Sequence, residues 1–456
     1  MTASYAGLPV LVAGAGASGE AAARALLGLG ALVTVADRTG SARATALAAA
    51  GARVELGLAA PPEGTRLVVT SPGWRPDAPL LVAAAAAGLE VIGEVELAWR
   101  LAGTRGRPAP WLALTGTNGK TTTVRMLESM LRAAGLRAVA TGNVGLPVLD
   151  AVLADPPCDV LAVELSSFQL HWSPSPRPLA AAVLNVAPDH LDWHGSLAGY
   201  AEAKARIYAG DPVAVFNADD EWSTRLAAGT RRRVGCTLSR PGRGQLGVEG
   251  GVLLDRAFDP AGAALVPAAE VRPAGPHNVA NALAAAALAR AYGVPAAAVA
   301  AGLRGFVPDP HRNAPVATIG GVSYVDDSKA TNPHAAAASL AGYPRVVWIA
   351  GGLLKGAPVD DLVAAVGSRL VGAVLLGADR AAVRDAIVRH APDLPVVEVT
   401  RTDDGAMSEV VRAAAGLARP GDTVLLAPAA ASLDMFADYA ARGDAFAAAV
   451  RALETP

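Results

Sequence analysis

Short apolar runs alternate with longer Ala-rich stretches along residues 1–100. The runs at 10–13, 32–36 and 67–70 are rich in Val and Leu and have the length of buried parallel strands. The Ala-rich stretches between them favour helices. This alternation predicts a doubly wound parallel sheet, which has helices on both of its faces.

The same alternation returns further along the chain. A second segment begins at Trp111 and continues through strands expected at 160–163 and 181–185. Between 229 and 273, short Val and Leu pieces separated by Gly and Arg predict hairpins, so this segment is expected to carry a β-rich appendage. An Ala-rich helix is expected at 278–291.

A third segment predicts another parallel open sheet, with strands at 321–325, 346–350, 372–376, 396–399 and 423–427. Two stretches rich in helix-breaking residues, 103–110 and 307–315, separate the three segments, and we interpret them as linkers. The chain is therefore expected to form three α/β domains, over 1–106, 107–308 and 309–456. The first and the third are expected to be Rossmann-like.

The composition agrees with this division. A chain of 456 residues is too long for one core, and about 150 residues per domain suggests three domains. Hydrophobic residues make up 52% of the chain but aromatic residues only 4%, which suits buried strands and close-packed helices. No uncharged apolar run approaches the roughly 20 residues of a membrane-spanning helix, so we expect a soluble protein.

The formal net charge of −2 excludes a broad field that would attract nucleic acid or an anionic membrane. We therefore expect small-molecule partners, no nucleic acid, no membrane, and a monomer. Cys158 and Cys236 are the only cysteines, too few for a disulfide framework and without metal-ligand spacing. No signal segment precedes the first strand, so the cytoplasm is the expected location.

The segment 114–123 joins an apolar strand to a Gly-bearing turn and then to a helix that opens with Lys120 and Thr121. Backbone N–H groups of such a turn point at phosphate oxygens, the lysine adds a positive charge, and the threonine hydroxyl can ligate Mg²⁺. The motif G-x-x-x-x-G-K-[ST] is matched except that Leu114 occupies its first position. A plain strand-to-helix turn would explain the glycines but not Lys120 beside several hydroxyls. The expected nucleotide-binding residues of this phosphate loop are Gly116, Thr117, Asn118, Gly119, Lys120, Thr121 and Thr122.

The segment 14–19 satisfies the dinucleotide fingerprint, because it follows a strand, opens a helix and has Asp37 at the end of the next strand. Taken alone it favours NAD. The same geometry holds any diphosphate, including that of a UDP-sugar, and a plain glycine turn that closes a helix on a sheet is the simpler alternative. The candidate ligand-binding residues of this domain are Gly14, Ala17, Ser18, Asp37, Arg38, Ser71, Pro72 and Gly73.

Polar residues follow two strands of the second segment. Glu164 ends one strand and is a candidate Mg²⁺ ligand, although a capping or solvated Glu is an alternative. After the next strand, 189–194 holds two His and two Asp, which suit a hard ion and a substrate. Asn278 and Asn281 are three residues apart on one helix face and could bind adenine, unless Asn278 is only a helix cap.

The third segment has three polar clusters after strands: 326–332, Lys355 and 427–436. Each cluster alone could be an ordinary surface loop. Together they place cations and hydroxyls at strand ends, a surface suited to a carboxylate substrate and to phosphate.

Taken in order, these motifs cover essentially the whole chain and resemble the Mur ligases of peptidoglycan synthesis. The segments 164–170, 326–332 and 427–436 are similar to the members that join D-glutamate to UDP-N-acetylmuramoyl-L-alanine. The resemblance implies an N-terminal UDP-substrate-binding domain, a central P-loop ATPase domain and a C-terminal glutamate-binding domain.

The resemblance also implies roles for single residues. It assigns catalysis to Lys120, Glu164, His190 and Lys204, and metal binding to Thr121, Glu164, His190 and Lys204, with two Mg²⁺ and a carbamylated Lys204. It adds Asn143 as a contact of the acceptor substrate. Facing ATP are Asn278, Asn281, Arg312, Asp327 and Lys329. Facing glutamate are Thr331, Lys355, Ser432, Leu433 and Tyr439, where the family would have Phe in place of Tyr439.

The implied reaction is ATP-dependent amide formation through an acyl phosphate, with the third domain closing about 307–315. Three alternatives stay open from the residues. They are a folylpolyglutamate synthetase-like ligase, an NAD-dependent dehydrogenase suggested by 14–19, and an ATP-switched binding protein.

Overall fold

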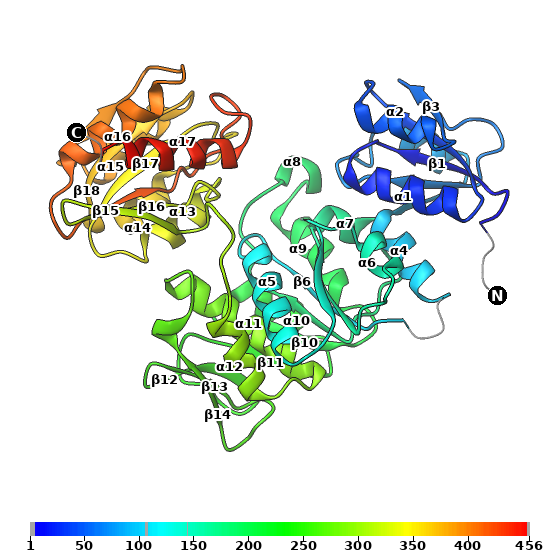
Figure 1. Ribbon diagram of the computed structural model, residues 1–456, viewed down its shortest axis with the longest axis horizontal. Helices are drawn as coiled ribbons and strands as arrows, with labels where there is room; N and C mark the ends of the chain where they lie inside the picture. The colour runs from blue at the N-terminus through cyan, green and yellow to red at the C-terminus, as the bar shows by residue number, and fades with distance from the viewer. Residues whose placement is uncertain (1–4, 105–107, 144, 454–456) are drawn as a thin grey trace. The chain divides into compact units, whose positions relative to one another are not determined.

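Three sheets carry the fold, one for each predicted βα segment (Figure 1). The structure is a computed structural model and describes residues 5–104, 108–143 and 145–453. The mostly parallel sheets, with helices between their strands, confirm the predicted α/β class. Part of the predicted linker 103–110, including the expected domain boundary at 106, lies outside the described residues.

The chain divides into two compact units. The first unit consists of 1–268 and 280–306 and contains two sheets, while the second consists of 269–279 and 307–456 and contains the third sheet. The expected boundary at 308 between the second and third domains stays a prediction. Among the described residues, no helix is both long and apolar enough to cross a membrane.

The N-terminal sheet has five parallel strands in the order β3-β2-β1-β4-β5. Its elements are β1 (Pro9–Ala13), α1 (Ala17–Gly28), β2 (Leu32–Asp37), α2 (Ala42–Ala49), β3 (Arg53–Leu56), β4 (Leu67–Thr70), α3 (Pro79–Ala86), β5 (Glu90–Gly93) and α4 (Glu94–Ala102). Ala13 at the end of β1 pairs with Ala36 of β2 and with Thr70 of β4. The turn after β1 therefore begins between the ends of β2 and β4.

The central sheet has nine strands in the order β14-β13-β12-β11-β10-β9-β6-β8-β7. Its strands are β6 (Trp111–Thr115), β7 (Ala138–Gly142), β8 (Val160–Glu164), β9 (Ala180–Val183), β10 (Val213–Asn217), β11 (Arg232–Cys236), β12 (Gln245–Glu249), β13 (Val252–Asp255) and β14 (Ala263–Pro267). The helices of this segment are α5 (Lys120–Ala133), α6 (Val148–Leu153), α7 (Ser167–His171), α8 (Leu191–His194), α9 (Leu197–Ala205), α10 (Glu221–Ala227), α11 (Pro276–Tyr292) and α12 (Ala296–Arg304), with 3₁₀ turns η1 (Arg206–Tyr208) and η2 (Ala268–Glu270). The hairpins predicted in 229–273 are β12–β13 and β13–β14, and they extend the parallel sheet instead of forming a separate one.

The C-terminal sheet has six strands in the order β15-β16-β20-β17-β18-β19, and only β15 runs antiparallel to its neighbour. Its elements are β15 (Ala314–Ile319), β16 (Val322–Asp326), α13 (Pro333–Leu340), β17 (Val346–Gly351), α14 (Asp360–Val366), η3 (Gly367–Arg369), β18 (Leu370–Leu376), α15 (Arg380–His390), β19 (Val396–Glu398), α16 (Ala406–Leu417), β20 (Thr423–Leu426) and α17 (Tyr439–Ala452). The predicted linker 307–315 extends two residues too far, because Ala314 and Pro315 already belong to β15. A proline is tolerated there because β15 is an edge strand, where a missing N–H need not break a ladder.

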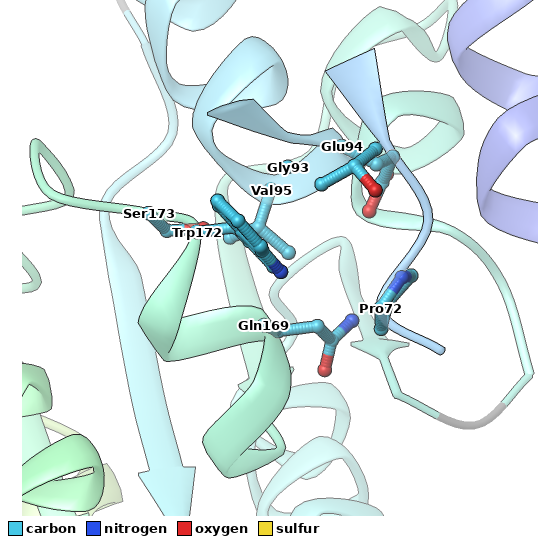
Figure 2. Close-up of a pocket in the computed structure, with 8 residues that line it drawn as sticks. Pro72, Gly93, Glu94, Val95, Gln169, Trp172 and Ser173 are labelled. Carbon is cyan, nitrogen blue, oxygen red and sulfur yellow. The ribbon is translucent and has the colours of Figure 1, made fainter. Parts of the chain in front are cut away.

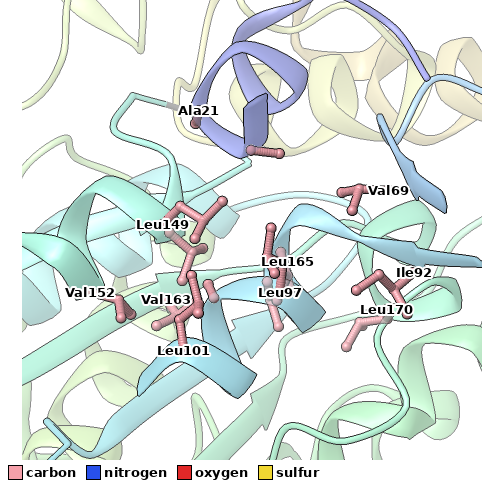
Figure 3. Close-up of a cluster of buried hydrophobic side chains, with 14 of the residues drawn as sticks. Ala21, Val69, Ile92, Leu97, Leu101, Leu149, Val152, Val163, Leu165 and Leu170 are labelled. Atoms are coloured by element: carbon pink, nitrogen blue, oxygen red, sulfur yellow. The ribbon is translucent and has the colours of Figure 1, made fainter. Parts of the chain in front are cut away.

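One hydrophobic cluster connects the two sheets of the first unit. Figure 3 shows Val69 of β4 and Leu97 and Leu101 of α4 in the same group as Leu149 of α6 and Val163 of β8. All five side chains are at most 4% exposed. Helix α4 therefore packs between the N-terminal and the central sheet.

Two glutamate side chains of α4 accept hydrogen bonds across this junction. Glu94 Oε1 accepts a hydrogen bond from Leu149 N at 2.7 Å, and Glu96 Oε2 accepts one from Ser175 N at 2.9 Å. Glu96 also pairs with Arg100. Burial raises the pKa of Glu94 to about 7, because the charged form loses its hydration.

We expect Glu94→Gln to stabilise the protein at alkaline pH. Because the pKa of Glu94 is raised in the folded state, the folded form holds this proton more tightly than the unfolded form, so stability falls as pH rises from about 4.5 to about 7. The full effect above that range is on the order of 3 kcal/mol. Thermal unfolding midpoints at pH 5 and pH 8 should differ less for Glu94→Gln than for the wild type. Glu96→Gln, which weakens the pair with Arg100, should instead lower the midpoint.

Candidate active site

The carboxyl ends of three neighbouring strands frame the phosphate loop. Strand β6 lies between β8 and β9, so Thr115, Glu164 and Val183 end side by side. The loop then turns through Gly119, whose φ of +82° requires a residue without Cβ, and Lys120 begins α5. The predicted strand–loop–helix arrangement of 114–123 is therefore confirmed.

Asn185, just after β9, holds the loop in shape. Its Oδ1 accepts hydrogen bonds from Thr117 N at 3.1 Å and from Asn118 N at 2.9 Å. Its Nδ2 donates to Asn118 O at 3.2 Å. One amide thus satisfies both donors and an acceptor of the turn.

Two lysines converge on one carbonyl of this loop. Lys120 Nζ donates to Gly116 O and to Thr117 O, each at 2.9 Å, and Lys204 Nζ donates to Gly116 O at 2.9 Å. Lys204 is 1% exposed although it lies on α9, where the sequence alone would favour a solvated lysine. Burial, and then the charge of Lys120, lower the pKa of Lys204 well below its ordinary value. An anion bound beside Lys120 and Lys204 would therefore stabilise this part of the site.

Glu164 lies at the end of β8, beside the phosphate loop in the sheet. It is 1% exposed, and its Oε1 accepts a 3.3 Å hydrogen bond from Asn143 Nδ2. Its Oε2 is buried without a hydrogen-bond partner. A buried carboxylate oxygen without a partner is costly unless a proton donor or a cation completes it.

His190 follows β9 and caps α8 with a left-handed backbone, φ 52°. The side chain of Asp189 lies beside it, with Oδ2 at 3.6 Å from His190 Nε2. Burial lowers the pKa of His190, and Asp189 partly opposes this, while Lys120 and Lys204 lower it further. The ring of Phe168 packs against His190 with ring centroids 4.8 Å apart. The segments after β8 and β9 therefore meet here.

Among the described residues, no three His, Cys, Asp or Glu side chains gather closely enough to hold a metal ion. Mg²⁺ does not need such a cluster, because it usually takes one or two carboxylates together with waters and substrate phosphates. The unpartnered Oε2 of Glu164 is a hard oxygen of the kind that Mg²⁺ prefers. The donor set present therefore fits Mg²⁺ bound jointly with a nucleotide.

Helix α11 reaches the phosphate loop through Asn281. A Cβ placed on Gly119 would lie 2.3 Å from Asn281 Oδ1, so the loop and this amide are in close contact. Asn278, one turn earlier on α11, is 3% exposed, and its Nδ2 donates to Ala274 O at 3.2 Å. The predicted helix at 278–291 is confirmed as α11.

In the N-terminal sheet, the turn after β1 is built for close approach. Gly14 has φ +99°, and a Cβ on Gly19 would lie 1.8 Å from Gly14 O. The carboxylate of Asp37 accepts hydrogen bonds from Ala15 N and Arg38 N, each at 2.7 Å. Asp37 thus stabilises the turn through its own hydrogen bonds. Its contact with a ligand stays a prediction. Ala17 and Ser18 begin α1 beside this turn.

A small pocket of the first unit lies between the end of β4, the start of α4 and α7 (Figure 2). Thr70 and Pro72, from the end of β4, line one side. Gln169 and Trp172, from the segment after Glu164, line the other side. Pro72, of the predicted UDP-substrate loop 71–73, therefore lies near the segment that follows Glu164.

In the second unit, backbone hydrogen bonds bring three strand-end loops together. Ala429 N donates to Ala330 O at 2.9 Å, and Leu353 N donates to Ala431 O at 2.8 Å. These bonds join the loops after β16, β17 and β20, which are neighbouring strands. The predicted glutamate-binding residues on these loops are Thr331, Lys355, Ser432 and Leu433.

Tyr439, the remaining predicted glutamate contact, lies next to a predicted ATP contact. The Nζ of Lys329 is 3.8 Å from the centroid of the Tyr439 ring, a cation–π distance. Burial raises the pKa of Asp327 to about 6, and its Oδ1 accepts a hydrogen bond from Asn313 N at 3.2 Å. Arg312 lies next to Asn313 in the chain, and its Nε is 3.9 Å from Asp309 Oδ2.

Two structural contributors were not expected from the sequence: Asn185 and Tyr200. Tyr200 Oη lies 3.4 Å from Thr117 Oγ1, and Lys204 Nζ is 4.3 Å from its ring centroid. The signal for Asn185 is its position as the last, polar residue of the expected strand 181–185, but no property of Tyr200 in the sequence distinguishes it from a core tyrosine.

The rarity of lysine in the sequence also points to the site. Only four of the 39 Lys and Arg residues are Lys, and all four are predicted site residues: Lys120, Lys204, Lys329 and Lys355. An arginine suffices where only positive charge is needed, whereas a compact ammonium or a reactive amine requires lysine.

Comparison with known proteins decides the family. Residues 114–289 match the model of the Mur ligase middle domain, and residues 311–430 match that of the Mur ligase glutamate ligase domain. A UDP-N-acetylmuramoylalanine–D-glutamate ligase of Thermobifida fusca is 63% identical over 413 residues, which cover 88% of each chain. The chain belongs to the Mur ligase family. It is therefore an ATP-dependent amide ligase. The interpretation of 14–19 as the NAD site of a dehydrogenase is not supported.

Two further relatives of this Mur ligase carry the same name. The one from Streptomyces coelicolor is 61% identical over 86% of each chain, and the one from Mycobacterium avium is 54% identical over 98% of this chain and 97% of its own. A solved UDP-N-acetylmuramate–alanine ligase from Thermotoga maritima superposes with a TM-score of 0.59 at 18% identity, covering 98% of this chain and 99% of its own. A pseudomurein peptide ligase from Methanothermus fervidus also has a TM-score of 0.59, at 20% identity over 92% and 96% of the two chains. The solved structures support the fold alone.

Proposed function

We propose that this Mur ligase joins D-glutamate to UDP-N-acetylmuramoyl-L-alanine in peptidoglycan precursor synthesis, with conversion of ATP to ADP and phosphate. The relatives at 54–63% identity carry the name of this activity. The observation that carries the proposal is the convergence of Lys120 and Lys204 on Gly116 O, beside the unpartnered carboxylate oxygen of Glu164.

The chemistry requires cations at this place. An oxygen of the substrate carboxylate attacks the γ-phosphorus of ATP, the bond to the β-phosphate oxygen breaks, and ADP leaves. The amine of D-glutamate then attacks the acyl carbon of the acyl phosphate, loses a proton and displaces phosphate. Because two anions must come together in the first step, positive charge around the phosphate loop lowers its barrier. Lys120 supplies such a charge.

Magnesium would be held by the side chains of Thr121, Glu164 and His190. When bound, Mg²⁺ neutralises phosphate charge and so assists the approach of the carboxylate. We propose that Lys204 carries a carbamate whose oxygens complete a second Mg²⁺ position. The low pKa of its buried amine supports this, since only an uncharged amine reacts with CO₂.

The remaining predicted residues are assigned by domain. Residues 1–106 would hold the UDP-substrate through the turn after β1 and through 71–73, and its peptide end would reach Asn143 and Glu164. Residues 107–308 would hold ATP, and residues 309–456 would bring glutamate. The nucleotide contacts would be Gly116, Thr117, Asn118, Gly119, Thr122, Asn278, Asn281, Arg312, Asp327 and Lys329.

A phosphate-release assay tests the proposal. With UDP-N-acetylmuramoyl-L-alanine, ATP and D-glutamate, we expect one phosphate per amide product, and a product mass equal to the sum of the two substrates less one water. L-Glutamate should give little or no phosphate release. Turnover of a folate substrate without turnover of the UDP-substrate would instead favour a folylpolyglutamate synthetase-like activity, and phosphate release without an amide product would favour an ATP-switched binding protein.

A further inference from the structure

One side chain outside the assigned site connects the segments after β8 and β9. His194 ends α8, and its backbone N–H donates to His190 O at 3.1 Å. Its ring Nε2 lies 2.9 Å from Ser167 Oγ. Ser167 is 2% exposed, begins α7 and lies three residues after Glu164. A single side-chain hydrogen bond therefore joins the segment of Glu164 to the turn of His190.

Ring packing reinforces this connection. Phe168 stacks on the ring of His194, with centroids 5.6 Å apart and planes 1° from parallel, and also packs on His190. His194 also contacts the ring of Tyr200, with centroids 5.1 Å apart. The Tyr200 ring in turn lies beneath the Nζ of Lys204. His194 thus contacts all three segments that carry proposed metal-binding side chains after the phosphate loop.

We propose that His194 is a positioning residue of the ligase. It fixes the spacing between Glu164 and His190 through Ser167 and Phe168, and the orientation of Lys204 through Tyr200. This inference rests on the proposed function in one respect: the spacing matters because these side chains bind Mg²⁺ together with ATP. Partners that orient metal ligands from outside the coordination sphere commonly change metal affinity or activity by about 10- to 100-fold.

The test separates the hydrogen bond from the packing. Ser167→Ala and His194→Phe each remove the bond, and His194→Phe keeps an aromatic ring against Phe168 and Tyr200. His194→Gln places an amide near the position of Nε2 and can restore the bond. Affinity for Mn²⁺, measured by electron paramagnetic resonance with a non-hydrolysable ATP analogue, gives a readout that does not require turnover. The Mg²⁺ concentration for half-maximal ligase rate is measured in parallel.

We expect Ser167→Ala and His194→Phe each to weaken Mn²⁺ binding by roughly 10-fold, and the double variant to be no weaker than either single variant, because both remove the same bond. His194→Gln should recover most of the affinity. His390→Phe is the matched control, because His390, at the end of α15, forms an exposed hydrogen bond with Asp360 of α14, and its replacement should leave Mn²⁺ binding unchanged.

Wild-type Mn²⁺ affinity in both Ser167→Ala and His194→Phe would overturn the role of His194, whatever their unfolding midpoints. Additive losses in the double variant would overturn it as well. If the wild type forms no amide product but the variants lose Mn²⁺ affinity as expected, the positioning role stands and the proposed activity fails. If product forms and the metal affinities stay equal, only the positioning role fails.

Discussion

Lys120→Ala should lower the ligase rate by on the order of 10³-fold while binding of the UDP-substrate stays near that of the wild type. Lys120 Nζ donates to the carbonyls of Gly116 and Thr117, beside which the γ-phosphate and the substrate carboxylate meet in the proposed reaction. Its loss removes the charge that offsets their repulsion. The predicted UDP-binding turn belongs to another sheet and is untouched. Phosphate release measures the rate, and calorimetric titration with the UDP-substrate measures binding.

Arg132→Ala is a suitable control, because Arg132 lies in the last turn of the same helix, away from the phosphate loop, and its side chain is 60% exposed although it pairs with the buried Glu128. It should leave the rate within about twofold of the wild type. Retained turnover in Lys120→Ala would refute the role of the lysine. A loss of UDP-substrate binding equal to the loss of rate would show that the substitution disturbs more than the phosphate loop.

The parallel strands and the loops at their carboxyl ends could be predicted from the sequence. Buried strands such as 67–70 are continuous apolar runs, and the loop glycines are required by local backbone geometry, as the left-handed Gly119 illustrates. Because parallel strands end at one edge of a sheet, the order of polar residues after strands also predicts which of them meet, as it does for Glu164 and the phosphate loop.

Features that depend on tertiary contact could not be predicted. The first two residues of β15 were assigned to a linker, because the edge position that tolerates Pro315 exists only once the sheet has formed. Two hydrogen bonds of the phosphate loop are examples. Asn185 accepts one from Asn118 N, and Lys204 donates one to Gly116 O, and each bond joins residues 67 or more positions apart. For Lys204, spacing along the helix does not single out the residue, because a lysine on a helix is ordinarily solvated, and only packing of α9 against the loop buries it.

Lys204→Ala should abolish most of the activity, by on the order of 10²-fold or more, and added formate or acetate should restore part of it. Lys204 is 1% exposed, so truncation leaves a buried space beside Gly116 O in which a small carboxylate can replace the proposed carbamate. The restored rate should rise with carboxylate concentration and saturate, as expected for binding at one site. The same carboxylates should leave the wild-type rate unchanged or slightly lower.

Lys120→Ala provides the contrast that makes this rescue informative. Both lysines donate to Gly116 O, so a merely electrostatic role would make the two variants respond alike, and an added anion would help neither. Rescue of Lys204→Ala alone means that the missing group is negatively charged, and therefore that the native side chain is not a simple ammonium. A ¹³C carbamate resonance in protein equilibrated with ¹³CO₂, present in the wild type and lost in Lys204→Ala, would identify that group directly. Equal rates with and without carboxylate, together with no such resonance, would leave Lys204 as a neutral amine bonded to the loop.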